Sequence, residues 1–188
     1  MVKKIILGSK SPRRQELIKA IGFPVELKTK EVEENYPENM APENVAEFLA
    51  EKKSKALRDG IKEDELLITS DTVVLLNHKI LGKPADKEDA TLMLQQLSGK
   101  QHEVITGVCL YAPHKTISFS NVTRVYFDIL EDTEIERYIE QYQPFDKAGS
   151  YGIQEWIGYI GIRKIEGCYY NVMGLPVNAI YQRIKQEF

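Results

Sequence analysis

Residues 7–14, LGSKSPRR, combine the end of an apolar segment with small polar residues and two arginines. Ser11 followed by Pro12 predicts a helix start, which places Arg13 and Arg14 in the first helical turn. Free backbone N–H groups and the helix dipole favour an anion there, and arginine matches phosphate oxygens. The segment therefore predicts a phosphate site that includes Ser9; the alternative is a pair of solvated arginines on a capped helix.

Two carboxylates are candidates for proton transfer or metal binding. Asp71 interrupts the apolar segment 66–76, LLITSDTVVLL, and a buried carboxylate must be paired, hydrogen-bonded or metal-bound. It is a candidate general base or metal ligand; the alternative is a carboxylate that caps a local kink. Glu33, in the acidic run 31–34, is a candidate second oxygen ligand, because a magnesium-type ion needs few protein carboxylates beside a substrate phosphate. For Glu33 the alternative is a solvated loop.

Lysines near helices and glycines are further candidates for phosphate binding. Lys53 falls on the inward arc of a helix expected over 42–59, where it either snorkels to water or delivers its ammonium into a cleft. Lys83 lies in LGKP (81–84) and Lys147 in DKAGSYGIQ (146–154), both beside a glycine that lets a ligand approach the backbone. The alternative for both segments is an ordinary surface turn.

The elements expected to position these residues interleave strands with helices. Strands are predicted over 3–7, 66–76, 102–111, 115–130, 159–165 and 169–172, and helices after Pro12, Pro42, Asp86, Thr133 and Pro176. Thr133 and Glu136 have the spacing of a capping box. The fold class predicted is α/β, a mixed sheet with flanking helices in one domain spanning 1–188.

Composition restricts the class of protein. Of the 188 residues, 43% are hydrophobic, which suffices for one core without disulfides or a structural metal. With two cysteines and three histidines, the chain has no disulfide framework or zinc motif. Its apolar runs are far too short for a membrane span or a signal peptide, so we expect a cytoplasmic protein without membrane contact.

The charge of the chain is unevenly distributed. The net charge is −3, which weighs against long polyanions, and we expect no nucleic-acid partner. Residues 1–30 hold eight bases and two acids, a surplus of +6, whereas residues 31–65 hold five bases and eleven acids, a balance of −6. This asymmetry fits a small anion accompanied by a cation.

The chemistry-bearing segments together resemble a known family. These segments are SKSPRRQEL (9–17), SDTVV (70–74), LGKP (81–84), LSGKQH (97–102), TGV (106–108), DKAGSYGIQ (146–154) and GLP (174–176). They occur in the order seen in the Maf family of nucleoside triphosphate pyrophosphatases, first named for septum formation. The resemblance spans almost the whole chain.

The resemblance implies a hydrolase that converts a nucleoside triphosphate to its monophosphate and pyrophosphate with a divalent cation, Mg²⁺ or Mn²⁺. It implies that Asp71 activates water, and that Arg13, Thr72 and Gln154 mark the branch acting on dTTP, UTP and modified pyrimidine nucleotides in a house-cleaning role. We expect Ser9, Arg14, Lys53 and Lys83 to bind phosphates, and Asp71 with Glu33 to hold the metal.

The implied fold is an elongated mixed sheet similar to that of inosine-triphosphatase-like enzymes, usually as a homodimer. Two rival functions are a non-catalytic nucleotide-binding regulator of cell division and a nucleic-acid-binding module. The intact Asp71 argues against the first, because a sensor needs no general base. The acidic total, and the absence of aromatic residues interleaved with the basic ones, argue against the second.

Overall fold

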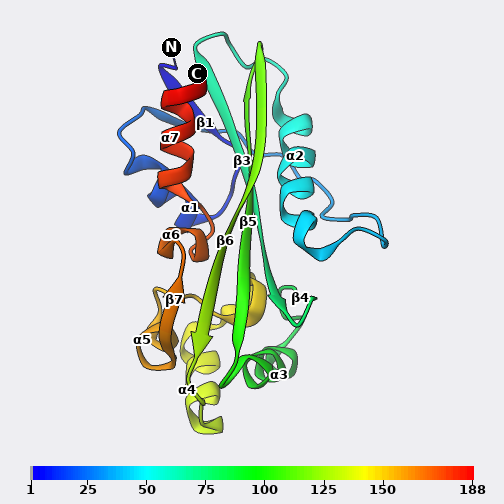
Figure 1. The fold of residues 1–188 in the computed structure, drawn as a ribbon, viewed down its shortest axis with the longest axis vertical. Coiled ribbons are helices and arrows are strands. Elements are labelled where there is room, and N and C mark those ends of the chain that lie inside the picture. The colour runs from blue at the N-terminus through cyan, green and yellow to red at the C-terminus, as the bar shows by residue number, and fades with distance from the viewer. Residues whose placement is uncertain (1) are drawn as a thin grey trace. The chain divides into compact units, whose positions relative to one another are not determined.

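The computed structural model describes residues 2–188, which form a seven-stranded mixed sheet with flanking helices (Figure 1). Six strands follow the order β2-β1-β3-β5-β6-β7, and β4 pairs with β3. The strands are β1 (Lys4–Leu7), β2 (Val25–Leu27), β3 (Glu65–Leu76), β4 (Lys79–Leu81), β5 (Gln101–Ala112), β6 (Lys115–Phe127) and β7 (Ile162–Glu166). The predicted α/β class is confirmed.

The helices are α1 (Pro12–Lys19), α2 (Val45–Leu57), α3 (Lys87–Leu97), α4 (Asp132–Tyr142), α5 (Trp156–Gly161), α6 (Tyr169–Val172) and α7 (Val177–Glu187). Short 3₁₀ helices cover Pro42–Asn44, Pro144–Asp146 and Ala148–Ser150. As predicted, Ser11 and Asp86 cap α1 and α3 by accepting backbone N–H groups. The chain divides into two compact units, and β3, β5 and β6 contribute residues to both.

The first unit comprises residues 1–71, 106–121 and 174–188. Strand β1 pairs in parallel with β2 and β3, and Figure 1 shows α2 and α7 on opposite sides of these strands. Helix α2 lies directly on β5, because a Cβ on Gly107 would stand 2.2 Å from the backbone nitrogen of Glu47. The missing side chain of Gly107 therefore permits this close approach.

The second unit comprises residues 72–105 and 122–173. Its core contains apolar residues of β3, β5 and β6 together with α3, which packs against α4. The turn between β3 and β4 has positive φ at Asn77 (50°) and His78 (61°), as a type I′ hairpin requires. The hairpin therefore fixes the register of β4 on the half of β3 that follows Asp71.

Three local predictions were wrong. Glu131, not Thr133, begins the capping box of α4, with Glu134 returning to its backbone N–H at 2.9 Å. The segment predicted as a strand over 159–165 starts in α5, and the one over 169–172 is α6. In α6 the Asn171 amide donates to the Val104 carbonyl at 3.0 Å, a tertiary contact that overrides the strand propensity of tyrosine and valine.

Candidate active site

The centre of the candidate active site in the first unit is an ion-paired cluster around Lys53. Its Nζ donates to Asp71 Oδ1 and lies 2.8 Å from Glu34 Oε1. The side chains of Lys53 and Asp71 are 16% and 11% exposed, whereas that of Glu34 is 46% exposed. Helix α2 thus delivers Lys53 to a carboxylate on β3, as its inward position on the predicted helix allowed.

The Asp71 carboxylate keeps one oxygen available for a ligand. Within residues 2–188, Lys53 is the hydrogen-bond donor to Asp71, and Oδ2 accepts none. The residue is 8% exposed on a strand whose neighbours are buried, so the backbone restricts its position. A carboxylate oriented by a cation on one oxygen can accept a proton, or contact a metal ion, through the other.

Arg14 does not have the solvated environment that the alternative to a phosphate ligand requires. Its Nε donates to the Gly174 carbonyl at 2.8 Å and its Nη1 to the Ser70 carbonyl at 2.9 Å. Burial lowers the pKa of the guanidinium, and the nearby Asp71 carboxylate opposes that shift. One of its donors thus holds the backbone immediately before Asp71, so Arg14 also contributes to the position of the carboxylate.

The start of α1 is organised by serines. Ser9 is 7% exposed, and its Oγ accepts the Ser11 N–H at 3.1 Å, which makes a tight turn into the helix. Arg13 is half-buried in the first turn. The segment 9–14 therefore adopts the capped helix start that its sequence predicted, with a basic side chain at the N-terminal end of the dipole.

The two neighbouring acids 33 and 34 lie in different surroundings. Glu33, predicted as a metal ligand, is exposed and accepts a hydrogen bond from Asn35 Nδ2 at 2.9 Å. Glu34 instead reaches the Lys53 ammonium that also binds Asp71. The acidic run has no regular secondary structure, so no periodicity could indicate which of its carboxylates faces Asp71.

No group of three or more His, Cys, Asp or Glu side chains within the described residues is placed to hold a metal ion. The carboxylates of Asp71 and Glu34 nevertheless contact the same ammonium group, that of Lys53, so they are close together. Magnesium is often held by one or two carboxylates, with phosphate and water completing its octahedron. Such oxygen donors fit a divalent ion that arrives with a triphosphate.

In the second unit, the loop 146–155 carries Gln154 and is tied down by polar contacts. Glu155 Oε1 lies 3.2 Å from Lys147 Nζ, and Glu155 Oε2 accepts the Tyr138 hydroxyl. That hydroxyl oxygen in turn accepts the Gly152 N–H at 3.0 Å. Burial and the Glu155 carboxylate raise the pKa of Tyr138, which keeps it a donor. Neither Tyr138 nor Glu155 stands out in the sequence as a candidate site residue.

An aromatic group supports the same loop. The His102 ring stacks on Phe127 and meets Tyr151 edge-on, and its Nε2 lies 2.7 Å from the Tyr151 hydroxyl. Burial lowers the pKa of His102 to about 3, so the ring is neutral at physiological pH. The Gly149 N–H donates to the Gly82 carbonyl at 3.0 Å, which joins the loop to the turn that carries exposed Lys83.

Two predicted site residues of the second unit are half-buried. Thr72 directly follows Asp71 on β3, and Gln154 precedes Glu155. Gln154 Oε1 and Ser150 Oγ are buried without a hydrogen-bond partner among residues 2–188. Buried acceptors are normally satisfied, so this amide oxygen is available to accept a hydrogen bond from a water molecule or a ligand.

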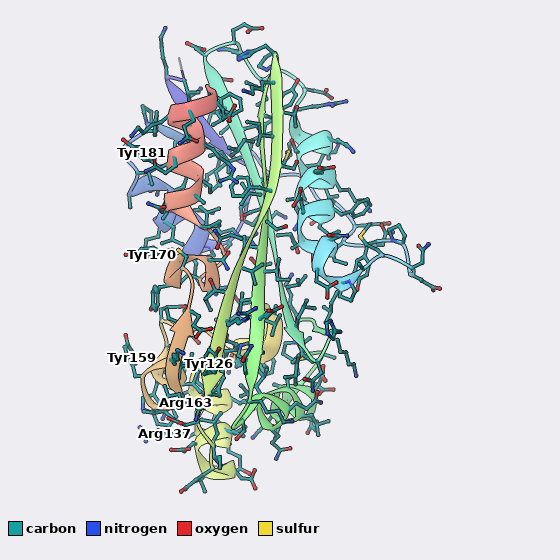
Figure 2. All side chains as sticks on the ribbon, in the orientation of Figure 1. Tyr126, Arg137, Tyr159, Arg163, Tyr170 and Tyr181 are labelled. Carbon is teal, nitrogen blue, oxygen red and sulfur yellow. The ribbon has the colours of Figure 1, made fainter. Side chains whose placement is uncertain are left out.

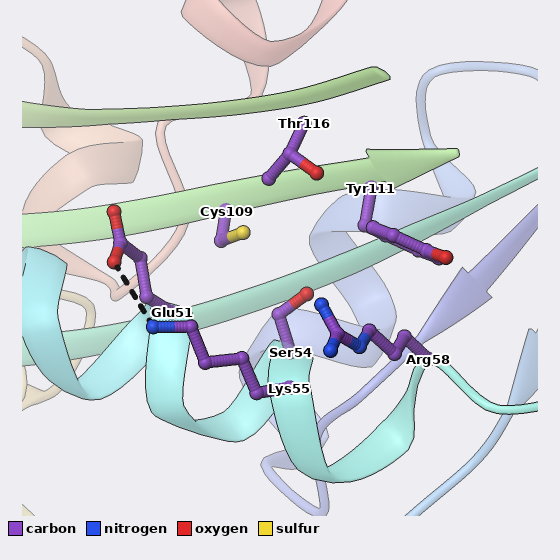
Figure 3. Close-up of a pocket in the computed structure, with 7 residues that line it drawn as sticks. All are labelled: Glu51, Ser54, Lys55, Arg58, Cys109, Tyr111 and Thr116. Carbon is purple, nitrogen blue, oxygen red and sulfur yellow. Dashed lines mark ion pairs between the residues drawn. The ribbon is translucent and has the colours of Figure 1, made fainter. Parts of the chain in front are cut away.

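A separate cavity of about 110 Å³ lies in the first unit (Figure 3). It is lined by Glu51, Ser54, Lys55, Arg58, Cys109, Tyr111 and Thr116, none of which was predicted as a site residue. Ser54 of α2 is buried. The acid among the lining residues, Glu51, pairs with Lys55 across 3.9 Å. Asp71 is not a lining residue, so this cavity is separate from the candidate general base.

Several aromatic side chains of the second unit are exposed, among them Tyr159 (78%) and Tyr170 (47%), both labelled in Figure 2. Basic residues on the same unit are paired with acids. Arg163 lies 3.7 Å from Asp128, and Lys164 lies 2.6 Å from Glu166. No helix among the described residues is long and apolar enough to cross a membrane.

The fold defines a class of α/β proteins that includes a solved structure, the Ham1 protein of Staphylococcus aureus. That structure matches with a TM-score of 0.53 at 15% identity, covering 99% of this chain and 100% of the other. Residues 4–187 match the family described as Maf-like protein. The chain therefore belongs to the Maf family.

Close relatives support the same assignment. A protein of Phocaeicola vulgatus named dTTP/UTP pyrophosphatase is 52% identical over 184 residues, which cover 97% of this chain and 95% of that one. A protein of Porphyromonas gingivalis with the same name is 51% identical over 185 residues, covering 97% and 93%. The recognition made from the motifs is confirmed.

Proposed function

We propose that this protein hydrolyses dTTP and UTP to the nucleoside monophosphate and pyrophosphate. The names of relatives at 52% and 51% identity support this activity. The observation that carries it is the Asp71 carboxylate, oriented by Lys53 through Oδ1 and with Oδ2 accepting no hydrogen bond from residues 2–188. This is the arrangement that a general base for water requires.

In the proposed reaction, Asp71 takes a proton from a water molecule. The water oxygen forms a bond to phosphorus, and the bridging phosphorus–oxygen bond breaks so that pyrophosphate leaves with the electron pair. Lys53 orients Asp71, and Ser9, Arg13 and Lys83 join it in stabilising charge on the phosphoryl oxygens. The hydrogen bond from Arg14 to the Ser70 carbonyl supports a role in holding Asp71, in addition to the predicted contact of Arg14 with phosphate.

Thr72 and Gln154 are proposed to recognise the base. The hydroxyl of threonine and the amide of glutamine can each donate and accept, which suits a pyrimidine edge with both kinds of group. The unpartnered Oε1 of Gln154 supports this role.

We propose Mg²⁺ or Mn²⁺ as the cofactor. Asp71 and Glu34 would hold it, because both carboxylates lie on the Lys53 ammonium, whereas Glu33 contacts Asn35. A bound divalent ion supplies positive charge that polarises the phosphoryl oxygens. A homodimeric state remains a prediction from the family resemblance, and a cytoplasmic location remains a prediction from the composition.

The test incubates the chain with Mg²⁺, Mn²⁺ or EDTA and a panel of canonical and modified nucleoside triphosphates. Pyrophosphate and orthophosphate are measured separately. We expect pyrophosphate and monophosphate from dTTP and UTP with metal, and no turnover in EDTA. Orthophosphate with a diphosphate product would exclude the pyrophosphatase, and binding without turnover would favour the nucleotide-binding regulator.

A further inference from the structure

The carboxylate next to Gln154 is held more firmly than a surface loop requires. Glu155 uses both oxygens, Oε1 toward Lys147 at 3.2 Å and Oε2 toward the hydroxyl of Tyr138. Lys147 and Tyr138 are 8% and 0% exposed. The Glu155 carboxylate therefore has one fixed position in the loop, and the proposed reaction does not explain why.

The Gln154 amide shares the space over Gly152 with this carboxylate. A Cβ on Gly152 would lie 3.0 Å from Gln154 Nε2 and 2.8 Å from Glu155 Cδ, so the absence of a side chain there admits both. A carboxylate attracts the amide N–H₂ group and repels the carbonyl oxygen. Glu155 therefore favours the amide orientation seen, with Nε2 over Gly152 and Oε1 buried without a partner among residues 2–188.

We propose that Glu155, held by Tyr138 and Lys147, is a positioning residue that fixes the Gln154 amide so that Oε1 accepts the N3–H of uracil or thymine. This inference rests on the proposed function, which assigns Gln154 to the base. Uracil and thymine carry hydrogen on N3, whereas N3 of cytosine is an acceptor beside an amino group. A fixed acceptor selects the first pair, while an amide free to turn over could match either edge.

The test compares binding of UTP and CTP to the full chain by isothermal titration calorimetry in EDTA. We expect CTP to bind at least about tenfold more weakly than UTP. Glu155→Gln keeps the side-chain shape but removes the charge, and should reduce the CTP/UTP ratio of Kd values about tenfold, toward one. Tyr138→Phe should move the ratio in the same direction.

A double-mutant cycle separates positioning from general destabilisation. If Glu155 acts through Gln154, then Glu155→Gln should leave the ratio unchanged in a Gln154→Ala background. The matched control is Thr123→Val, which removes another buried hydroxyl of the second unit, bonded to the backbone N–H of Cys168 at 3.0 Å. It should lower the unfolding midpoint without changing the ratio.

The inference is overturned if Glu155→Gln leaves the ratio at the wild-type value, or shifts it equally in the Gln154→Ala background. Pyrophosphate release is measured on the same samples with Mg²⁺. A shifted binding ratio without pyrophosphate release would support the positioning role and overturn the proposed hydrolysis. Failure to bind UTP in EDTA would overturn the positioning role, and failure to bind together with no pyrophosphate release in Mg²⁺ would overturn both.

Discussion

Each unit places a largely buried lysine between two carboxylates, yet the two clusters differ in what they leave available. Lys53 contacts Asp71 and Glu34, while Lys147 contacts Glu155 and Asp146 at 3.2 and 2.7 Å. Tyr138 occupies the second oxygen of Glu155, whereas Oδ2 of Asp71 accepts no hydrogen bond from the described part of the chain. The same ion-pair chemistry therefore suits proton transfer in one cluster and rigid support in the other.

The largest expected effect comes from removing the available carboxylate. Asp71→Asn keeps the shape but removes the base, so pyrophosphate release from UTP should fall about 10³-fold while the circular dichroism spectrum is retained. The control, Asp128→Asn, changes an exposed carboxylate that pairs with Arg163 at 3.7 Å, and should retain wild-type turnover. Undiminished turnover in the Asp71 variant would exclude it as the base.

Substituting the lysine of each cluster should distinguish a cluster that supports the fold from one that also supports turnover. Lys147→Met leaves the Glu155 carboxylate without its cation, and urea unfolding should show a loss of about 3 kcal/mol. Lys53→Met leaves the buried Asp71 carboxylate without its cation and should cost a similar stability, but in addition it should reduce turnover about 100-fold. The comparison fails if the two variants lose turnover to the same extent.

The smallest expected effect is the pH dependence of stability that comes from the buried ring of His102. Burial lowers the pKa of His102 in the folded chain to about 3, against an ordinary value near 6.5. The unfolded chain therefore binds a proton below about pH 6.5 that the folded chain does not. The stability that the chain gains from keeping His102 neutral and buried is therefore fully present above pH 6.5, and the free energy of unfolding declines as the pH falls toward 3.

At pH 5 the loss should reach about 2 kcal/mol, measured by urea unfolding across a pH series. A His102→Gln variant should lack this slope. His114→Gln should keep it, because His114 is exposed beside Glu63. A wild-type slope in the His102 variant would assign the pH dependence to another group.

Two residues that stand out in the sequence because they violate a local pattern lie in contact in the structure. Asp71 was conspicuous because it interrupts an apolar strand, and Lys53 because it faces inward on a helix; the structure brings these two together. Helix starts at Ser11 and Asp86 were predictable because capping is decided within one turn.

The features that the sequence did not predict depend on distant contacts or irregular backbone. Glu34 and Glu33 are adjacent in a segment without periodicity, so their different partners could not be distinguished. The segment 156–161 is a helix because Gly158 fits against the Ile153 carbonyl, where a Cβ would lie at 1.9 Å. In the sequence, Tyr138 occupies an apolar position of an amphipathic helix. The role of its hydroxyl is visible only in the structure, where it donates to Glu155 and accepts from the Gly152 N–H.

The close seating of α2 on β5 makes the candidate base sensitive to a residue that never meets it. Any side chain at Gly107 would have to lift the helix, since a Cβ would stand 2.3 Å from the Ala46 carbonyl carbon. Lys53 lies two turns further along that helix and would move with it. The distance between Asp71 and Lys53 therefore depends on the absence of a side chain at Gly107 of strand β5.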